Sequence, residues 1–545
     1  MMTADRRSGR ADTVFVLHPV LWTARVFDRV LVHPRSHIDH HMRRPKHLQE
    51  TLSDEIYNYT WAFDAQRVAK MLSATDKCPP APLVNVAHRS LEGKAPPIWP
   101  ANCPVRAWNA PLAKFLNDCV DACNQALDEH PRSAPRDSRF YHRLKFIAYG
   151  KPTAEGVEGA SPLKPDVVGG LDLVPGEQVA WRLGHTSESI KQALIPVDLE
   201  MDWSHMVAQA AVYARCLFSA TSSRQFALII GFLPSRAELR FLVFHRSGLT
   251  ASKPCSVNEP RGRWDILRMF LSILEWTSLN DAGFLDFFNG FEMPLLRYEG
   301  DKTGALARIS HGLYRHIRLR GHATEAVLME YAKGGISETE FCLSPPGQRN
   351  KETRMSFISS TDQWVPDVYI IEESHTIPSP RQYLTPVKCP SVSESIWSSS
   401  LNTNTADGDC TSVLVKYAWH EAERQKIRNE LLVKCASSFG TTHHHYSFCP
   451  ADSRGKPMST ARFLPTDGEN LRDFHWSVID RSKVPSDSRC RFMWFHVNQA
   501  AGRSLVHAKT PWELHLAVGH AMLGGYRLRL LVSQFLTRQQ GGCRW

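Results

Sequence analysis

The alternation of apolar and polar residues along the chain predicts an α/β domain between residues 105 and 300. The segment Pro111 to His130 has apolar residues at helical spacing, and Ile195 to Met201 is expected to form a strand. The continuous apolar run Phe226 to Leu233 is typical of a strand that is buried on both faces. Glu238 to His245 follows after a short link and should pair with that strand as a hairpin.

Two helices and one short strand complete this predicted domain. The residues Lys164 to Gly170 indicate a short strand and a turn, and Asp265 to Thr277 indicates a helix on the sheet. Ser204 is expected to cap another helix. The buried face of that helix is predicted to consist of Met206, Ala210, Tyr213 and Leu217. Strand, helix, strand and hairpin in this order define an α/β domain.

A second ordered block is predicted from residue 411 to residue 524. Thr411 to Trp419 has the composition of a strand, His420 to Cys435 is expected to be helical, and Arg491 to Val497 is an apolar strand. Thr510, Pro511 and Glu513 form a capping box at the start of a helix that ends at Gly524. Outside these blocks, residues 1–104 are assigned as a region of helices and loops. The segment 336–411 is rich in Ser, Thr, Asn and Pro and is therefore expected to be a disordered insertion.

Composition narrows the class of protein. The content of 43 % hydrophobic and 22 % charged residues is that of a globular protein, and the longest apolar run has too few residues to cross a bilayer. Thirteen cysteines occur without a CxxC pair, which favours free thiols in a reducing compartment, the cytoplasm or the nucleus. The formal charge of +10 is spread along the whole chain, so nucleic-acid binding remains an alternative without a defined basic patch.

The first group of candidate functional residues is a strand lysine followed by helix glutamates. Lys416 ends the strand sequence VLVK, and Glu423 and Glu430 lie on one face of the helix expected after it. In kinases a strand lysine contacts the α- and β-phosphates of ATP and a helix glutamate holds that lysine in place. Either glutamate fits this role. Glu430 is preferred, because an acid in the first turns, such as Glu423, also suits the helix dipole.

Several longer stretches resemble the fungal-type protein kinase family. The similar stretches are VLVKYAW ending at Trp419, FGTTHHHYSF (439–448), SLVHAKTPWELHLAVGHAMLG (504–524), YARCLFSATSSRQFALIIGF (213–232), ELRFLVFHRSGLT (238–250) and LRGHATEAVLMEY (319–331). The resemblance covers about residues 105 to 524. It implies a two-lobed kinase fold and the ATP- and Mg²⁺-dependent phosphorylation of Ser or Thr in a protein substrate.

The resemblance assigns parts of the kinase to positions in this sequence. Residues 301–335 correspond to the first hairpin, with Gly321 matching its glycine, and 411–524 to the rest of the N-lobe, the hinge near 497–502 and the first C-lobe helix. Lys416 and Glu430 match the ATP lysine and its partner. The remaining 525–545 form an atypical tail without Asp, Glu or Asn, so the C-lobe is expected to be largely missing. No H-R-D or D-F-G segment is found, and the chain as given is expected to be an inactive kinase. An ATP-binding pseudokinase is the alternative.

The upstream domain resembles a degenerate PD-(D/E)xK nuclease fold. Pro165-Asp166 matches the first acid of that pattern and Asp198 the second, but Glu200 stands where the pattern has lysine. Nuclease chemistry needs carboxylates to hold a divalent metal and the lysine to steady the attacking water. A negative side chain in place of the lysine makes this chemistry improbable, so Asp166 and Asp198 are only weak metal candidates. The overall expectation is an α/β nuclease-like domain followed by an α+β kinase-like N-lobe.

Overall fold

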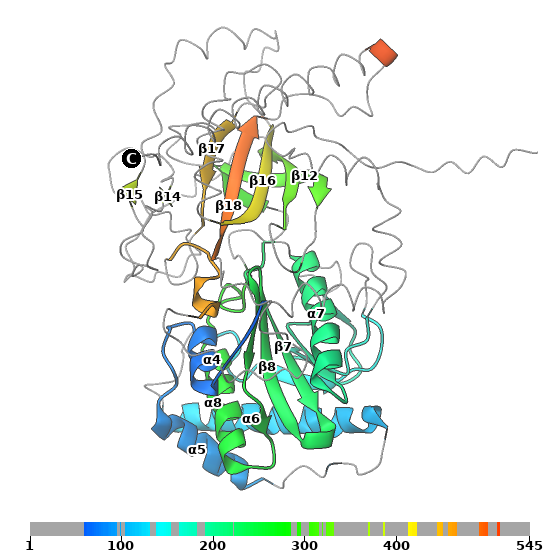
Figure 1. Ribbon diagram of the computed structural model, residues 1–545, viewed down its shortest axis with the longest axis vertical. Coiled ribbons are helices and arrows are strands. Elements are labelled where there is room, and N and C mark those ends of the chain that lie inside the picture. Colours follow the sequence, from blue (N-terminus) through cyan, green and yellow to red (C-terminus); the bar gives the residue numbers. More distant parts are fainter. Residues whose placement is uncertain are drawn as a thin grey trace, which may run out of the picture.

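The structure is a computed structural model, and Figure 1 shows its trace. The residues that it describes are 59–94, 99, 104–130, 138–153, 163–181, 191–221, 223–284, 292–295, 305–315, 319, 323–331, 369–370, 385–386, 412–421, 444–450, 456–465, 490–499 and 510–512. Two large sheets organise most of these residues, a mixed sheet in the first half of the chain and an antiparallel sheet in the second, and two further sheets of two strands each are formed by Val179–Ala180 with Lys191–Gln192 and by Tyr369–Ile370 with Thr385–Pro386.

The first half forms an α/β domain around a mixed sheet of eight strands. The order in the sheet is β1-β9-β8-β7-β6-β3-β2, with β10 paired to β8. The pairs β1–β9 and β6–β7 are parallel and the others are antiparallel. Its elements are β1 (Thr60–Phe63), α4 (Ala65–Leu72), α5 (Ala81–Glu92), η2 (Val105–Trp108), α6 (Asn109–Glu129), β2 (Leu144–Ala148), β3 (Val167–Leu171), β4 (Val179–Ala180), β5 (Lys191–Gln192), β6 (Ile195–Leu199), α7 (Trp203–Ala220), β7 (Phe226–Leu233), η3 (Pro234–Arg236), β8 (Glu238–His245), β9 (Gly248–Ser252), β10 (Cys255–Ser256) and α8 (Pro260–Leu274).

Helices cover both faces of this sheet, as Figure 1 shows. Helices α4, α5, α6 and α8 share one core with alternate residues of β7 such as Leu228 and Ile230. Helix α7 packs on the opposite face, against Ala227 and Ile229. Successive side chains of a strand point to opposite faces, so a central strand between two helical layers has to be apolar at every position. This explains the uninterrupted apolar sequence of β7.

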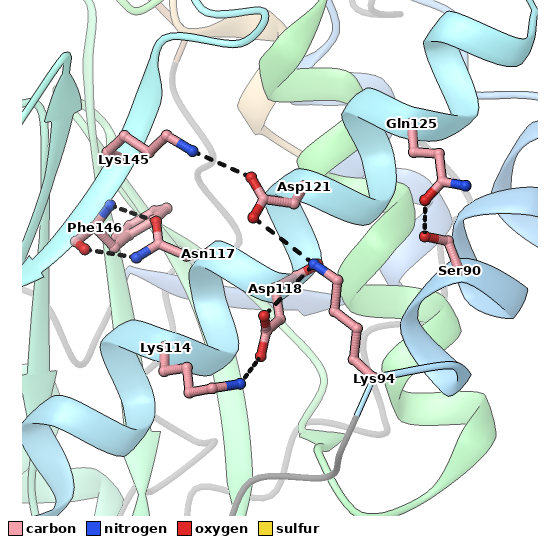
Figure 2. Close-up of polar contacts among 9 residues, drawn as sticks. All are labelled: Ser90, Lys94, Lys114, Asn117, Asp118, Asp121, Gln125, Lys145 and Phe146. Carbon is pink, nitrogen blue, oxygen red and sulfur yellow. Dashed lines mark hydrogen bonds and ion pairs between the residues drawn. The ribbon is translucent and has the colours of Figure 1, made fainter.

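The edge strand β2 is held by helix α6 in place of another strand. Figure 2 shows the side chain of Asn117 against the backbone of Phe146: its Nδ2 donates to the carbonyl oxygen at 2.8 Å, and its Oδ1 accepts from the amide nitrogen at 2.9 Å. The same helix side carries ion pairs from Asp121 to Lys145 and to Lys94. A polar side chain thus satisfies backbone groups that an open sheet edge would expose.

Replacing Asn117 by leucine is expected to lower the free energy of unfolding by about 1–2 kcal/mol. The change keeps the size of the side chain and removes two hydrogen bonds to the edge strand, each worth about 1 kcal/mol. Urea denaturation measures the loss. Ser90→Ala is the control, because it removes an exposed hydrogen bond to Gln125 of the same helix α6, and its loss should lower the stability by less than about 0.5 kcal/mol. Equal stability of the two variants would contradict this role of Asn117.

The second half forms an antiparallel sheet with the order β11-β12-β13-β16-β18-β17. Its inner face carries a separate core that includes Val415, Tyr417 and Phe495. Strand β16 is central, between the hairpin β12–β13 and strand β18. The elements are β11 (Glu292–Leu295), β12 (Ala305–Arg315), β13 (Glu325–Tyr331), β14 (Tyr369–Ile370), β15 (Thr385–Pro386), β16 (Ser412–Glu421), β17 (His444–Phe448), η6 (Ala461–Phe463) and β18 (Arg491–Gln499).

The structure confirms mixed α/β content and the predicted strands, with differences at several boundaries. Helix α7 is capped by Asp202, whose side chain accepts from the amides of Ser204 and His205, so the cap predicted at Ser204 is wrong by two positions. Strand β16 continues to Glu421, because cross-strand pairing with β18 extends that far; the helix predicted from His420 therefore cannot begin there.

The α/β domain also contains residues upstream of position 105. Strand β1 pairs with β9, and helices α4 and α5 share the core of α6 and α8. The short strands β14 and β15 pair within the segment 336–411, most of which lies outside the described residues, as do 525–545 and the predicted helix at 510–524 beyond residue 512.

Candidate functional site

Lys416 lies in the middle of the second sheet and is 2 % exposed. Its strand neighbours Val415 and Tyr417 point into the core of that sheet. By strand alternation the lysine belongs to the other face. Across the strands it faces Ala326 of β13 and His496 of β18. The candidate ATP lysine is therefore anchored by a paired strand on each side.

The face of the sheet that carries Lys416 is buried and combines polar side chains with apolar ones such as Leu414 and Trp494. His496 lies opposite Lys416, and its Nδ1 shares a hydrogen bond of 2.7 Å with Ser447 Oγ of β17. Asn498, on the same face, donates from Nδ2 to the carbonyl oxygen of His496 at 3.3 Å. His420 completes the group, with its ring 6.0 Å from that of His496. These side chains can offer several donors and acceptors to a polar ligand.

Sequence reasoning missed this polar face, although a signal was present. The sequence predicts an apolar strand at Arg491 to Val497. In β18, which continues to Gln499, Met493, Phe495 and Val497 belong to the core of the sheet and alternate with Trp494, His496 and Asn498, so the second face carries two polar residues beside the tryptophan. The two other residues predicted around Lys416, Glu430 and Gly321, lie outside the described residues.

The second candidate site is a group of carboxyl side chains on β3 and β6. Asp166 directly precedes β3, which pairs antiparallel with β6, where Asp198 lies. Asp166 Oδ2 accepts from the backbone amide of Leu199, the residue after Asp198, at 3.3 Å. Asp166 Oδ1 accepts from Asn109 Nδ2 at 3.1 Å. The structure thus places the two acids at neighbouring positions, Asp166 just before β3 and Asp198 on the adjacent strand β6.

Asp198 is completely buried on the side of helix α7. Its Oδ1 accepts from Gln209 Nε2 at 3.1 Å and from Tyr213 Oη at 3.4 Å. Its Oδ2 has no hydrogen-bond partner among the described residues. Gln209 and Tyr213 are four positions apart and therefore lie on one helix face. This spacing is visible in the sequence, but it does not indicate that the two residues bind a carboxyl group.

Burial dominates the electrostatics of this carboxyl group. It raises the pKa of Asp198 well above its ordinary value, and the negative charges of Asp166 and Glu200 raise it further. Burial also raises the pKa of Asp166, against the hydrogen bonds from Asn109 and Leu199. The pKa of Glu200 is raised by burial as well, with His205 acting in the opposite direction. All three environments favour the neutral carboxylic acid.

Carboxylate ligands bind a cation in their deprotonated form, so the affinity of these carboxyl groups for a metal ion would rise with pH. Among the described residues, no three His, Cys, Asp or Glu side chains are arranged so that they could hold a metal ion. The described cysteines, which include Cys119 and Cys123 in the core, are free thiols.

The comparisons with known proteins indicate no family, so the assignment of a function rests on the residues of this chain. No protein-family model, no curated protein and no solved structure matches the chain. Within the described ranges, no helix has the length and apolar character needed to span a membrane.

Proposed function

We propose that the second sheet is the nucleotide-binding part of a protein-kinase-like domain of the fungal type, and that Lys416 contacts the phosphates of bound ATP. The observation that carries this proposal is the place of Lys416 on the central strand β16. The hairpin β12–β13, which would cover the phosphates, lies on one side of this strand. On the other side, β18 leads into the expected hinge at 497–502, which would meet the adenine.

The sequence motifs and the polar face support the same function. The stretch VLVKYAW ends within the strand that carries the lysine, and LRGHATEAVLMEY ends within β13, its direct neighbour. His496 and Asn498 line the face on which Lys416 lies. The proposal is limited to nucleotide binding, since the 545 residues contain no H-R-D or D-F-G segment that would supply the base and the Mg²⁺ ligands of phosphoryl transfer.

For the α/β domain we propose a nuclease-like fold without metal-dependent nuclease chemistry. An acid before β3 and an acid on β6 support the likeness in fold. The glutamate at position 200 opposes the chemistry, because it stands where the attacking water needs a positive side chain. The role of this domain is then structural or one of recognition.

Thermal denaturation with and without Mg²⁺-ATP tests the nucleotide site. At a concentration 100 times the dissociation constant, a ligand stabilises the folded state by about 2.7 kcal/mol, which should raise the melting temperature by roughly 5 °C or more. Lys416→Met keeps the aliphatic stem and removes the ammonium group, and it should abolish the shift. The melting temperature of each variant without nucleotide gives its own baseline.

The matched control is Lys145→Met, a strand lysine of the α/β domain that pairs with Asp121. This variant should retain the full ATP-induced shift. An ATP shift that persists in Lys416→Met, or that is absent from the unaltered chain, would refute the proposed site.

A further inference from the structure

One short segment contacts both sheets, and we call residues 456–465, between β17 and β18, the clasp. Figure 1 shows it in orange between the two sheets. On the side of the second sheet, the clasp runs along the start of β18. The amide of Thr460 donates to the carbonyl oxygen of Arg491 at 2.9 Å. The amide of Met493 donates to the carbonyl oxygen of Met458 at 3.0 Å. Ser459 forms an isolated bridge with Phe492.

On its other side the clasp enters the core of the α/β domain. Phe463 is 0 % exposed, and its ring packs on those of Phe226 and His245 at 5.2 Å each. Leu464 belongs to the same core. These apolar residues sit at the end of the sheet where β7 begins and β8 ends. The α/β core is therefore completed by a residue that lies more than 200 positions further along the chain.

Hydrogen bonds fix the clasp at the same end of the first sheet. Thr250 Oγ1 donates to the carbonyl oxygen of Phe463. Ser247 Oγ and Thr460 Oγ1 share a hydrogen bond of 2.7 Å, and all of these hydroxyl groups are buried. Gln225 Nε2 donates to the carbonyl oxygen of Ser459 at 2.6 Å. The contact combines apolar packing with hydrogen bonds, and the direction of these bonds defines how the clasp lies on the α/β domain.

Thr460 connects this contact to the strand of Lys416. Its Oγ1 accepts from the backbone amide of Arg491 at 3.0 Å, in addition to its bond with Ser247. The Arg491 Nη2 donates to Glu421 Oε1 at 2.9 Å, across the pair β16–β18, and both side chains are at most 10 % exposed. A continuous chain of bonds thus runs from β8–β9 of the first sheet through the clasp to β18 and β16.

We propose that the clasp couples the two domains, so that a change at the end of β7–β9 in the α/β domain alters the local stability of strands β16 and β18. The coupling needs no nucleotide and no movement of the domains as separate bodies. It acts because Thr460 bonds to both sides of the contact with one side chain, and because Phe463 belongs to the core of the α/β domain.

Native-state amide hydrogen exchange of the full chain without ATP tests the coupling. The double variant Ser247→Ala/Thr250→Val alters only the α/β side and removes two bonds to the clasp. We expect the exchange of amides in 412–421 and 491–499 to become about 5- to 10-fold faster, which corresponds to one lost hydrogen bond or slightly more. The absence of nucleotide makes the result independent of the proposed function.

Val84→Ala is the matched control, because it truncates a buried residue of α5 without touching the clasp. It should destabilise the α/β domain and leave exchange in β16 and β18 unchanged. Gln225→Ala, which removes the bonds to Ser459 and Arg462, gives a smaller increase of about 3-fold and serves if the double variant does not fold. Unchanged exchange in β16 and β18, with faster exchange only in 458–464, would overturn the proposal.

Discussion

Replacing Phe463 by alanine is expected to lower the free energy of unfolding of the α/β domain by about 3–5 kcal/mol. The loss consists of the transfer free energy of a buried aromatic ring and the cavity that it leaves between Phe226 and His245. The surrounding side chains are packed between a sheet and helices, so they could fill the cavity only if these elements shifted. Urea denaturation, followed by tryptophan fluorescence, measures the change.

Two further variants separate packing from a general effect of aromatic residues. Phe463→Leu keeps most of the apolar volume and should restore more than half of the lost stability. Trp512→Ala removes a larger side chain that is 73 % exposed, and it should change the stability by less than about 0.5 kcal/mol. A loss below about 1 kcal/mol in Phe463→Ala would mean that the clasp rests on the α/β domain without completing its core.

Several elements, among them β6, β7, β8, β16, β18, α6, α7 and α8, followed from local patterns in the sequence. The continuous apolar run of β7 and the short link to β8 identified a hairpin, and the helical spacing of Met206 and Tyr213 identified α7. Boundaries were less accessible. Asp202 and Ser204 are both good N-cap residues, and only the position of the first helical turn decides between them.

Contacts between distant segments could not be derived from these patterns. Nothing in the sequence around Phe463 indicates that its ring packs on Phe226, because an aromatic residue in a short polar segment has no period. The same holds for β1, which lies parallel to β9 although almost 190 positions separate them, and whose sequence was assigned to a helical and loop region. Such pairings depend on the whole fold rather than on local preference.

The two candidate sites differ in how much the sequence revealed. The acid pair Asp166 and Asp198 was predicted from its motif, and the strands that carry these acids are adjacent. Their hydrogen bonds were not predicted, because the donors Asn109 of α6 and Gln209 of α7 come from helices on different sides of the sheet. For Lys416, the strand and its two neighbours were predicted in order, whereas its polar surroundings on β17 and β18 were found only in the structure.

Asp198→Asn is expected to make the chain more stable at pH 8 while leaving its stability at pH 4 nearly unchanged. Asparagine keeps the acceptor for Gln209 and Tyr213 and cannot ionise. The pKa of Asp198 is raised in the folded state, chiefly by burial, so the folded state holds the proton more firmly than the unfolded state. The stability of the unaltered chain therefore falls as the pH rises from the unfolded pKa, near 3.9, to the folded one.

The size of this effect follows from the linkage between protonation and folding. Each unit by which the folded pKa exceeds the unfolded one costs about 1.4 kcal/mol above the folded pKa, and the pKa of Asp198 lies well above its ordinary value. Urea denaturation at pH 4, 6 and 8 should therefore give a falling series for the unaltered chain and a flatter one for Asp198→Asn. Asp172→Asn, an exposed aspartate in an ion pair with Arg143, should retain the falling series.

The opposite result would have a specific meaning for the site. If Asp198 were a carboxylate that shares a cation with Asp166, Asp198→Asn would lower the stability at pH 8, and Mg²⁺ would stabilise the unaltered chain but not the variant. That outcome would refute the neutral buried acid and restore metal binding to the α/β domain. A neutral Asp198 instead makes this part of the sheet a buried polar contact between β6 and α7, formed by Gln209 and Tyr213.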